Sequence, residues 1–289
     1  MSSLIDRLDR TLRRNPLMPR VDWLRGPLRK TYHRFLNRFT DGMELRIGGV
    51  LPVRLPAEFT SRELQTYEPE NATHIAKWVA EHPNGVFVDI GCSYGYFTCG
   101  VLHASESVRV IAIDADTPSL AITRHICQYA SGLERLTLLR TLVGQNSESP
   151  TTRESIADQT SHALEDPRIK LDPRDTNYVN WDNEAPESHL PRIALDTLLR
   201  GAIEDDVPLL IKCDVEGAEH VVLDGMSETL RRPETTLLFS VHPQYLPKFD
   251  SSPDAIRRTL DANGYDVDVI GIDHEEHWLC TSRGGGVKS

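Results

Sequence analysis

The segment 86–97, with the sequence VFVDIGCSYGYF, has the residue types and spacing of a nucleoside-binding turn. It predicts a buried strand, a tight turn through Gly91 and Gly95, and the start of a helix, because glycine lacks a Cβ and lets the backbone turn sharply near a ligand. A second predicted strand, 108–113, ends at Asp114. A carboxylate at that point of a βαβ unit can accept hydrogen bonds from both hydroxyls of a ribose. These residues therefore predict a cofactor that contains adenosine.

The spacing within the turn favours S-adenosylmethionine (SAM) over a dinucleotide. A dinucleotide-binding turn uses the pattern G-x-G-x-x-G so that backbone amides reach a pyrophosphate, whereas position 93 here is a serine. Asp89, just before the turn, would repel a phosphate but suits a cofactor that carries an ammonium and a sulfonium. An NAD-dependent oxidoreductase and a purely structural glycine turn are the alternatives. The predicted cofactor-binding residues are Asp89, Gly91, Cys92, Ser93, Gly95, Tyr96, Asp114 and Ala115, with Val143 near the adenine.

Length and composition narrow the class of protein. A chain of 289 residues with 39% apolar residues is long enough for one sizeable α/β domain with additions, or for two domains at most. No membrane span is expected, since long apolar runs and an apolar signal core are both missing from the sequence. Five cysteines occur without a CxxC pair, which is typical of reduced, buried thiols in a cytoplasmic protein.

Charge is distributed unevenly along the chain. The net charge is −11, yet residues 1–40 carry ten Lys/Arg and only three Asp/Glu. The acidic remainder argues against nucleic acid as a partner, because a phosphate backbone would be repelled. The basic N-terminal segment is suited to an anionic membrane surface or an acidic partner, or to a solvated helix face paired with the acidic body.

Residues 1–69 are predicted to form an accessory region of helices and a β-hairpin. Apolar residues at helical spacing predict helices at 4–14 and after Pro27, and residues 43–55 predict a hairpin that turns at Gly48-Gly49. This region is expected to cover the active site or to mediate dimerisation, so that a homo-oligomer is one expectation.

Residues 70–289 are predicted to form the catalytic domain. Alternating strands and helices predict an α/β fold with a Rossmann-like, doubly wound, mostly parallel sheet and a C-terminal antiparallel hairpin. Residues 145–190 are polar with little periodicity, which predicts a mobile insertion near the substrate or a spacer. The expected elements are a helix ending before Pro83, strand 86–90, helix 95–103, strand 108–113, helix 117–130, strand 136–143, strand 209–214, helix 218–230, strand 236–241, helix 253–262 and hairpin strands near 266–271 and 277–282.

The segment 211–219, IKCDVEGAE, is the most specific motif of the chain. Together with the glycine turn, with LDTL at 195–198 and with His242 after the next strand, it makes residues from about 65 to 289 resemble the FkbM family of SAM-dependent methyltransferases. The resemblance implies a class I methyltransferase fold and, most often, O-methylation of a hydroxyl on a sugar, a glycan or a natural-product small molecule. In two places the chain departs from the family: Cys92-Ser93 replaces Ala-Asn, and Ser240 stands where the family tends to have a glutamate.

Methyl transfer to a hydroxyl needs alignment of the acceptor oxygen with the methyl group and benefits from a nearby base. His242 follows a predicted strand and has a pKa range suited to neutral pH, so it is the candidate base, unless it only packs against Pro243. Asp214 and Glu216 are expected to hold His242, to contact the acceptor or cofactor, or to cap the following helix. Lys212 is expected to pair with these carboxylates. A non-catalytic SAM-binding protein is a further alternative, and N- or C-methylation is an alternative reaction.

No metal site is expected. Asp214, Glu219, His242 and the loop HEEH at 274–277 contain residue types that can bind metals. The two histidines of the loop, however, lack a recognised ligand spacing and are predicted to lie in an exposed turn. The sequence also lacks a Walker loop, a Gly-x-Ser-x-Gly elbow and a zinc-finger pattern.

Overall fold

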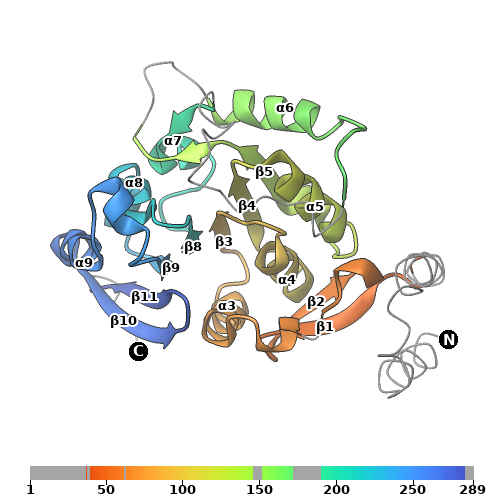
Figure 1. The fold of residues 1–289 in the computed structure, drawn as a ribbon, viewed down its shortest axis with the longest axis horizontal. Helices are drawn as coiled ribbons and strands as arrows, with labels where there is room; N and C mark the ends of the chain where they lie inside the picture. The colour runs from red at the N-terminus through yellow and green to blue at the C-terminus, as the bar shows by residue number, and fades with distance from the viewer. Residues whose placement is uncertain (1–36, 38–39, 62, 146–151, 172–189, 284–289) are drawn as a thin grey trace.

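A computed structural model describes residues 37, 40–61, 63–145, 152–171 and 190–283, which are built around a seven-stranded mixed sheet (Figure 1). The strands from β9 to β5 are parallel, whereas β11 is antiparallel to both of its neighbours. The predicted doubly wound α/β fold with a C-terminal antiparallel hairpin is confirmed. In spatial order the strands are β10 (Tyr265–Ile272), β11 (Glu276–Ser282), β9 (Thr235–Val241), β8 (Leu209–Asp214), β3 (Val86–Ile90), β4 (Arg109–Asp114) and β5 (Leu136–Arg140).

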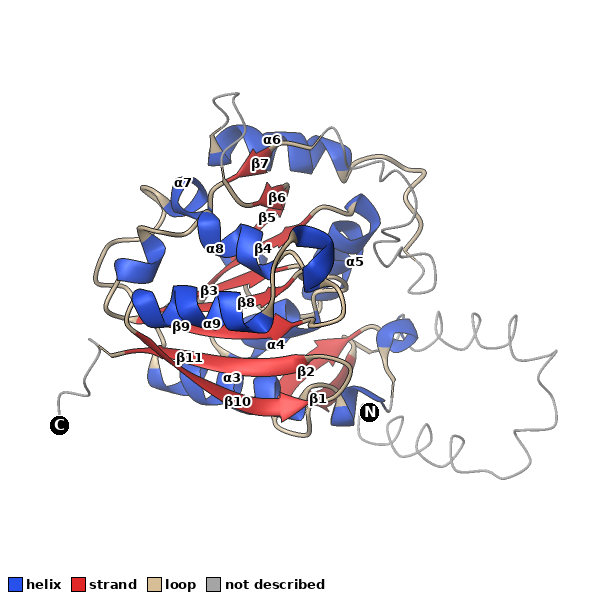
Figure 2. Cartoon of the chain, turned by 60° about the vertical axis from the view of Figure 1, so that its left-hand side comes forward, coloured by secondary structure: helices blue, strands red, loops and turns tan. Residues whose placement is uncertain are grey.

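Helices cover both faces of the sheet. On one face lie α3 (Pro69–Glu81), α4 (Tyr96–Ala104) and α5 (Thr117–Cys127), and on the other lie α7 (Leu195–Leu199), α8 (Glu219–Asp224) and α9 (Pro253–Ala262). Figure 2 shows α8 and α9 in front of the sheet. Side chains of the central strand β3 alternate between these faces, with Phe87 in one cluster and Val88 in the other. Burial on both faces explains why β3 is an almost continuous apolar run.

The N-terminal hairpin packs against helix α4, which lies on one face of the main sheet. Strands β1 (Met43–Ile47) and β2 (Leu51–Leu55) pair antiparallel around Gly48 and Gly49, both at positive φ, which confirms the predicted hairpin. A Cβ on Gly100 of α4 would lie 2.7 Å from the Leu51 side chain, so the hairpin and α4 are in direct contact. The helices predicted at 4–14 and after Pro27 lie outside the described residues.

The polar insertion 145–190 contains a helix that the sequence analysis missed. Helix α6 (Arg153–Ala163) begins after Thr152, whose side-chain oxygen accepts a hydrogen bond from the Ser155 amide. Its buried Thr160 accepts a hydrogen bond from the Arg140 amide of β5 at 2.8 Å. The prediction was wrong for this segment because a helix with only a narrow apolar face gives almost no periodic signal.

Two further elements differ from prediction. The expected strand 136–143 is divided into β5 and β6 (Leu142–Val143), and β6 pairs with β7 (Arg192–Ile193) instead of the main sheet. Helix α8 ends at Asp224, because the chain at Gly225 packs so closely against Gly144 that a Cβ on Gly225 would lie 2.3 Å from the Gly144 carbonyl oxygen.

The described residues also contain short 3-10 helices. These are η2 (Ala57–Phe59), η3 (Glu63–Thr66), η4 (Leu133–Arg135), η6 (Thr229–Arg231) and η7 (Leu246–Phe249). None of the helices within the described ranges has the length and apolarity to cross a membrane.

Candidate active site

The expected ribose-binding carboxylate is fixed at the carboxyl ends of β3 and β4. Asp114 Oδ2 accepts a hydrogen bond from the Ser93 amide at 2.8 Å, and Oδ1 accepts one from the Asp116 amide at 2.9 Å. Each oxygen keeps a second lone pair that can accept from a ribose hydroxyl. Burial raises the pKa of Asp114 to about 7, although the two amide hydrogen bonds oppose that shift. The arrangement fits the nucleoside end of SAM.

The two glycines of the turn are required by contacts within the protein. A Cβ on Gly91 would lie 1.8 Å from the Asp214 carbonyl oxygen, and a Cβ on Gly95 would lie 2.4 Å from the Thr123 side chain. Both glycines also have positive φ, which a residue with a side chain adopts only with strain. The sequence analysis expected these glycines to permit a sharp turn and the close approach of a ligand. The structure confirms the turn, and Gly91 also brings residues 91–95, which we call the cofactor turn, against the end of β8.

Asp89 lies inside the protein, between the sheet and α4. Its side chain accepts a hydrogen bond from Thr98 Oγ1 at 2.7 Å, and it is almost fully buried. Burial raises the pKa of Asp89 to about 6, against the lowering effect of the nearby Lys212 ammonium. Asp89 is therefore held by Thr98 at the strand end that precedes the turn.

The remaining predicted cofactor residues differ in how deeply they are buried. Ser93 is exposed at positive φ, whereas Cys92 is buried with its sulfur 3.8 Å from Thr123 Oγ1. Val143 is also buried, in the same hydrophobic cluster as the main sheet. Tyr96 donates a hydrogen bond to the Phe59 carbonyl at 3.5 Å, and the Ala115 carbonyl accepts one from Arg140.

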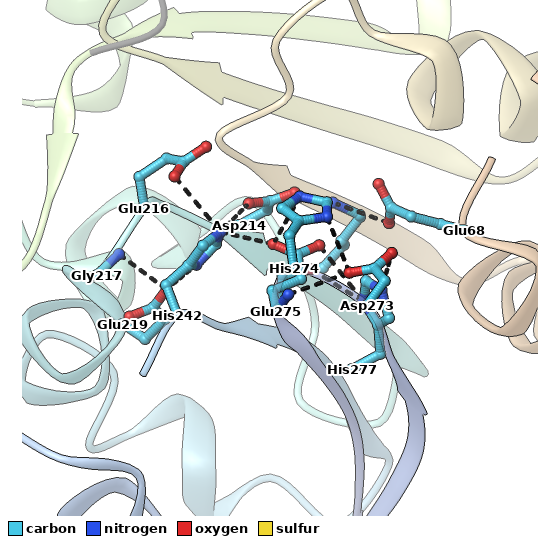
Figure 3. Close-up of polar contacts among 12 residues, drawn as sticks. Glu68, Asp214, Glu216, Gly217, Glu219, His242, Asp273, His274, Glu275 and His277 are labelled. Carbon is cyan, nitrogen blue, oxygen red and sulfur yellow. Dashed lines mark hydrogen bonds and ion pairs between the residues drawn. The ribbon is translucent and has the colours of Figure 1, made fainter. Parts of the chain in front are cut away.

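A buried histidine, His242, is surrounded by carboxylates near the carboxyl ends of β8 and β9 (Figure 3). His242 follows β9 and is 1% exposed. Its Nδ1 lies 2.7 Å from Glu219 Oε1, and its Nε2 lies 2.6 Å from Glu275 Oε2. Glu216 Oε2 and Asp214 Oδ1 lie 3.5 and 3.8 Å from the same Nε2. We call these five residues the His242 cluster.

The surroundings of His242 alter its expected chemistry. Burial alone would lower the pKa of the imidazole, but the Glu219, Glu275 and Asp214 carboxylates outweigh it and raise that pKa to about 11. His242 therefore holds a proton at neutral pH when only the protein surrounds it. The position predicted for His242 is correct, but the expectation of a pKa suited to a neutral-pH base is wrong, since the sequence did not reveal how many carboxylates face the ring.

Lys212 pairs with the carboxylates, as predicted. Its buried Nζ lies 2.9 Å from Asp214 Oδ2 and 3.7 Å from Glu68 Oε2. Burial would raise the pKa of Asp214, but Lys212 and His242 hold it below its ordinary value. Asp214 therefore remains ionised between a lysine on its own strand and a histidine on the next.

Glu216 is the most solvent-accessible carboxylate of the His242 cluster. It lies at positive φ in the turn after β8, and 36% of its side chain is exposed. Burial raises the pKa of Glu216 against the lowering effect of His242, and the neighbouring Asp214 and Glu275 carboxylates add to the upward shift. The alternative that Asp214 or Glu216 caps α8 is not supported, because the capping position is Ala218 and no side chain caps it.

Glu275 is the cluster member that the sequence analysis misplaced. Its loop was expected to be an exposed turn, yet Glu275 is 4% exposed and His277 is 2% exposed within β11. The register of β9 and β11 pairs Ser240 with His277 and Val241 with Glu276, which brings Glu275 beside His242. Glu275 thus supplies a carboxylate near the place where Ser240 departs from the family pattern.

Asp196, within the LDTL segment, has a structural role in the described residues. Its carboxylate accepts hydrogen bonds from the Glu228 and Thr229 amides, both at 2.8 Å, and from the Ser227 and Thr229 hydroxyls. It therefore fixes the turn that follows α8 instead of contributing to the site.

A comparison with protein families identifies a domain in this chain. The Methyltransferase FkbM domain matches residues 89–267. Among curated proteins, no significant match is found. A solved FkbM methyltransferase from Methylobacillus flagellatus KT is 18% identical, with a TM-score of 0.43, and the alignment covers 69% of this chain but only 44% of that chain.

Two further solved structures contain the cofactor or its product. TrmK of M. capricolum with S-adenosylhomocysteine is 10% identical, with a TM-score of 0.37 over 72% of this chain and 65% of that chain. Fibrillarin of Aeropyrum pernix with SAM is 9% identical, with a TM-score of 0.39 over 69% of this chain and 66% of that chain. The domain match covers more than half of the sequence and favours SAM over NAD. This chain belongs to the FkbM family of SAM-dependent methyltransferases and has the class I methyltransferase fold.

Proposed function

We propose that this protein transfers the methyl group of SAM to a hydroxyl of a sugar, a glycan or a natural-product small molecule. The observation that carries the proposal is the contact between the cofactor turn and the His242 cluster. Gly91 packs against the carbonyl of Asp214, whose side chain belongs to that cluster. Ligands of doubly wound sheets bind beyond the carboxyl ends of the strands, where these two groups of residues meet.

In this proposal the cofactor-binding residues fix one reactant. Asp114 accepts from the ribose hydroxyls while the Ser93 and Asp116 amides hold its carboxylate in place. SAM supplies an electrophilic methyl carbon, and its carbon–sulfur bond electrons leave with sulfur to give S-adenosylhomocysteine. Holding a reactant in line in this way can contribute several kcal/mol to the lowering of the barrier.

Glu216 is the proposed base. A hydroxyl acceptor must lose its proton as its oxygen bonds to the methyl carbon, and a half-buried carboxylate with a raised pKa is suited to accept it. His242 is the proposed positioning residue, because its Nε2 lies 3.5 Å from Glu216 Oε2 and 3.8 Å from Asp214 Oδ1. Asp214 would then contact a neighbouring acceptor hydroxyl.

The test uses SAM with a labelled methyl group and a panel of glycosides and polyhydroxylated natural products, with amine and thiol counterparts. We expect the label on oxygen, with assignment by NMR of the product. Glu216→Gln should lower kcat by about 10²- to 10⁴-fold with unchanged affinity for S-adenosylhomocysteine. The exposed Asp268→Asn is the matched control, because it removes a carboxylate from β10 outside the site. Label on nitrogen alone, or full activity of Glu216→Gln, would contradict the proposal.

A further inference from the structure

The His242 cluster carries more negative charge than its own cations can neutralise. The Lys212 ammonium faces Asp214 and Glu68, and the His242 ring faces Asp214, Glu216, Glu219 and Glu275. These five carboxylates face the two cations Lys212 and His242. Even with a third positive charge on His277, whose Nδ1 lies 3.6 Å from Glu275 Oε1, the negative charges would outnumber the positive ones. Concentrated negative charge in a largely buried region is unfavourable unless a further cation offsets it.

The arrangement around the ring is that of a metal-ligating histidine. Glu219 Oε1 lies 2.7 Å from Nδ1 and is itself held by the Gly217 amide at 3.0 Å. A carboxylate on one ring nitrogen fixes the tautomer that donates from that nitrogen, which leaves the lone pair of the other nitrogen for a metal ion. In His242 the other nitrogen is Nε2, which faces Asp214, Glu216 and Glu275.

Nε2 has no hydrogen-bond partner with suitable geometry among the described residues, although it belongs to an almost fully buried ring. Glu275 Oε2 is only 2.6 Å away, but it does not lie in line for a hydrogen bond. A buried ring nitrogen is normally paired. Nε2 of His242 instead points at oxygens of Asp214, Glu216 and Glu275 together. A cation bound among these oxygens would satisfy the nitrogen better than a single hydrogen bond.

We infer that Asp214, His242 and Glu275 form a divalent-cation site, with Glu216 at its open side. One ligand atom from each of the three lies within 4.8 Å of the others. Ligand atoms at about 2.0–2.2 Å from a shared ion lie roughly 3–4 Å apart. The distances from Nε2 to Asp214 and Glu216 fall in that range, and Glu275 needs to move by only a few tenths of an ångström.

The donor set identifies the class of ion. Carboxylates favour Mg²⁺, Ca²⁺ and Mn²⁺, whereas a neutral imidazole favours first-row transition metals. One imidazole with two or three carboxylates fits Mn²⁺ better than Mg²⁺. In methyl transfer, an ion here would bind the acceptor hydroxyl and make its proton easier to lose; this catalytic role rests on the function proposed above, whereas ion binding does not.

The experiment measures Mn²⁺ binding to the full-length protein after chelator treatment, by the EPR signal of free Mn²⁺, without cofactor or acceptor. We expect one tight Mn²⁺ per chain. Asp214→Asn and Glu275→Gln should each weaken it at least tenfold, and Glu219→Gln should weaken it about 10- to 100-fold by releasing the ring. Asp268→Asn should bind Mn²⁺ like the wild type, because it removes a similar charge from β10 without touching the site.

NMR of the wild-type histidine ring signals locates the ion even if a variant fails to fold. The chain has 11 histidines, and Mn²⁺ should broaden the His242 signals at the lowest concentrations. Broadening confined to the exposed His274, which lies with Asp273 beside Glu275, would overturn the inference, as would the absence of stoichiometric binding. Mn²⁺ binding without any methyl transfer would contradict the proposed function alone, and undiminished transfer by a protein that binds no Mn²⁺ would contradict this inference alone.

Discussion

Replacing Asp114 with asparagine should weaken the binding of S-adenosylhomocysteine by about ten- to a hundredfold. The wild-type carboxylate accepts from the Ser93 and Asp116 amides and keeps one lone pair on each oxygen. Asparagine has one acceptor oxygen, so its NH₂ group must face one of the two amides and cannot accept from a ribose hydroxyl. Loss of one hydrogen bond to a charged group costs about 1.5–3 kcal/mol, which corresponds to this range of affinities.

The pH dependence makes this prediction more specific. Burial raises the pKa of Asp114 to about 7, so the carboxylate becomes ionised as the pH rises through that value. The ionised form is the better acceptor, and the affinity of the wild type should therefore increase from pH 6 to pH 8. Asp114→Asn should lack this component of the increase, since it has no proton to lose.

The assay is isothermal titration calorimetry at several pH values, with thermal unfolding to show that the variant is folded. Asp268→Asn is the control for loss of one negative charge at a distance from the turn. If folded Asp114→Asn bound S-adenosylhomocysteine within a factor of two of the wild type, with the same pH profile, Asp114 would not be the ribose ligand.

Two further predictions concern stability. Gly91→Ala should lower the free energy of unfolding by about 2–5 kcal/mol, because a Cβ would overlap the Asp214 carbonyl and the positive φ adds strain; a change below about 1 kcal/mol in urea unfolding would refute the packing argument. The second concerns His242, whose folded pKa of about 11 lies above the ordinary 6.5. Its stabilising contribution is complete below about pH 6.5 and is lost as the pH rises through about 11. In the presence of chelator, wild-type stability should therefore fall relative to His242→Gln by on the order of 1 kcal/mol per pH unit between pH 7.5 and 9.5, and parallel profiles would contradict the raised pKa.

The strands of the sheet were well predicted from the sequence because their signals are local. The run Val86–Ile90 is apolar throughout, as a strand buried on both faces must be, and its bounds match the observed β3. Helix α9 was likewise predicted with its observed bounds, and the Asn263-Gly264 pair after its end was the signal for its termination. Helix α6 was missed, since its polar sequence gives little periodicity and its stability depends on packing against β5.

The sequence by itself determined the cofactor class, the succession along the chain of the strands in the main sheet and the placement of His242 after the fifth parallel strand, since short motifs and hydrophobic patterns encode these features. The tertiary structure alone decided that Glu275 reaches His242, because the register between β9 and β11 brings together residues distant in sequence. It also decided the proton affinity of His242, because a pKa depends on burial and on every charge that surrounds the ring in space.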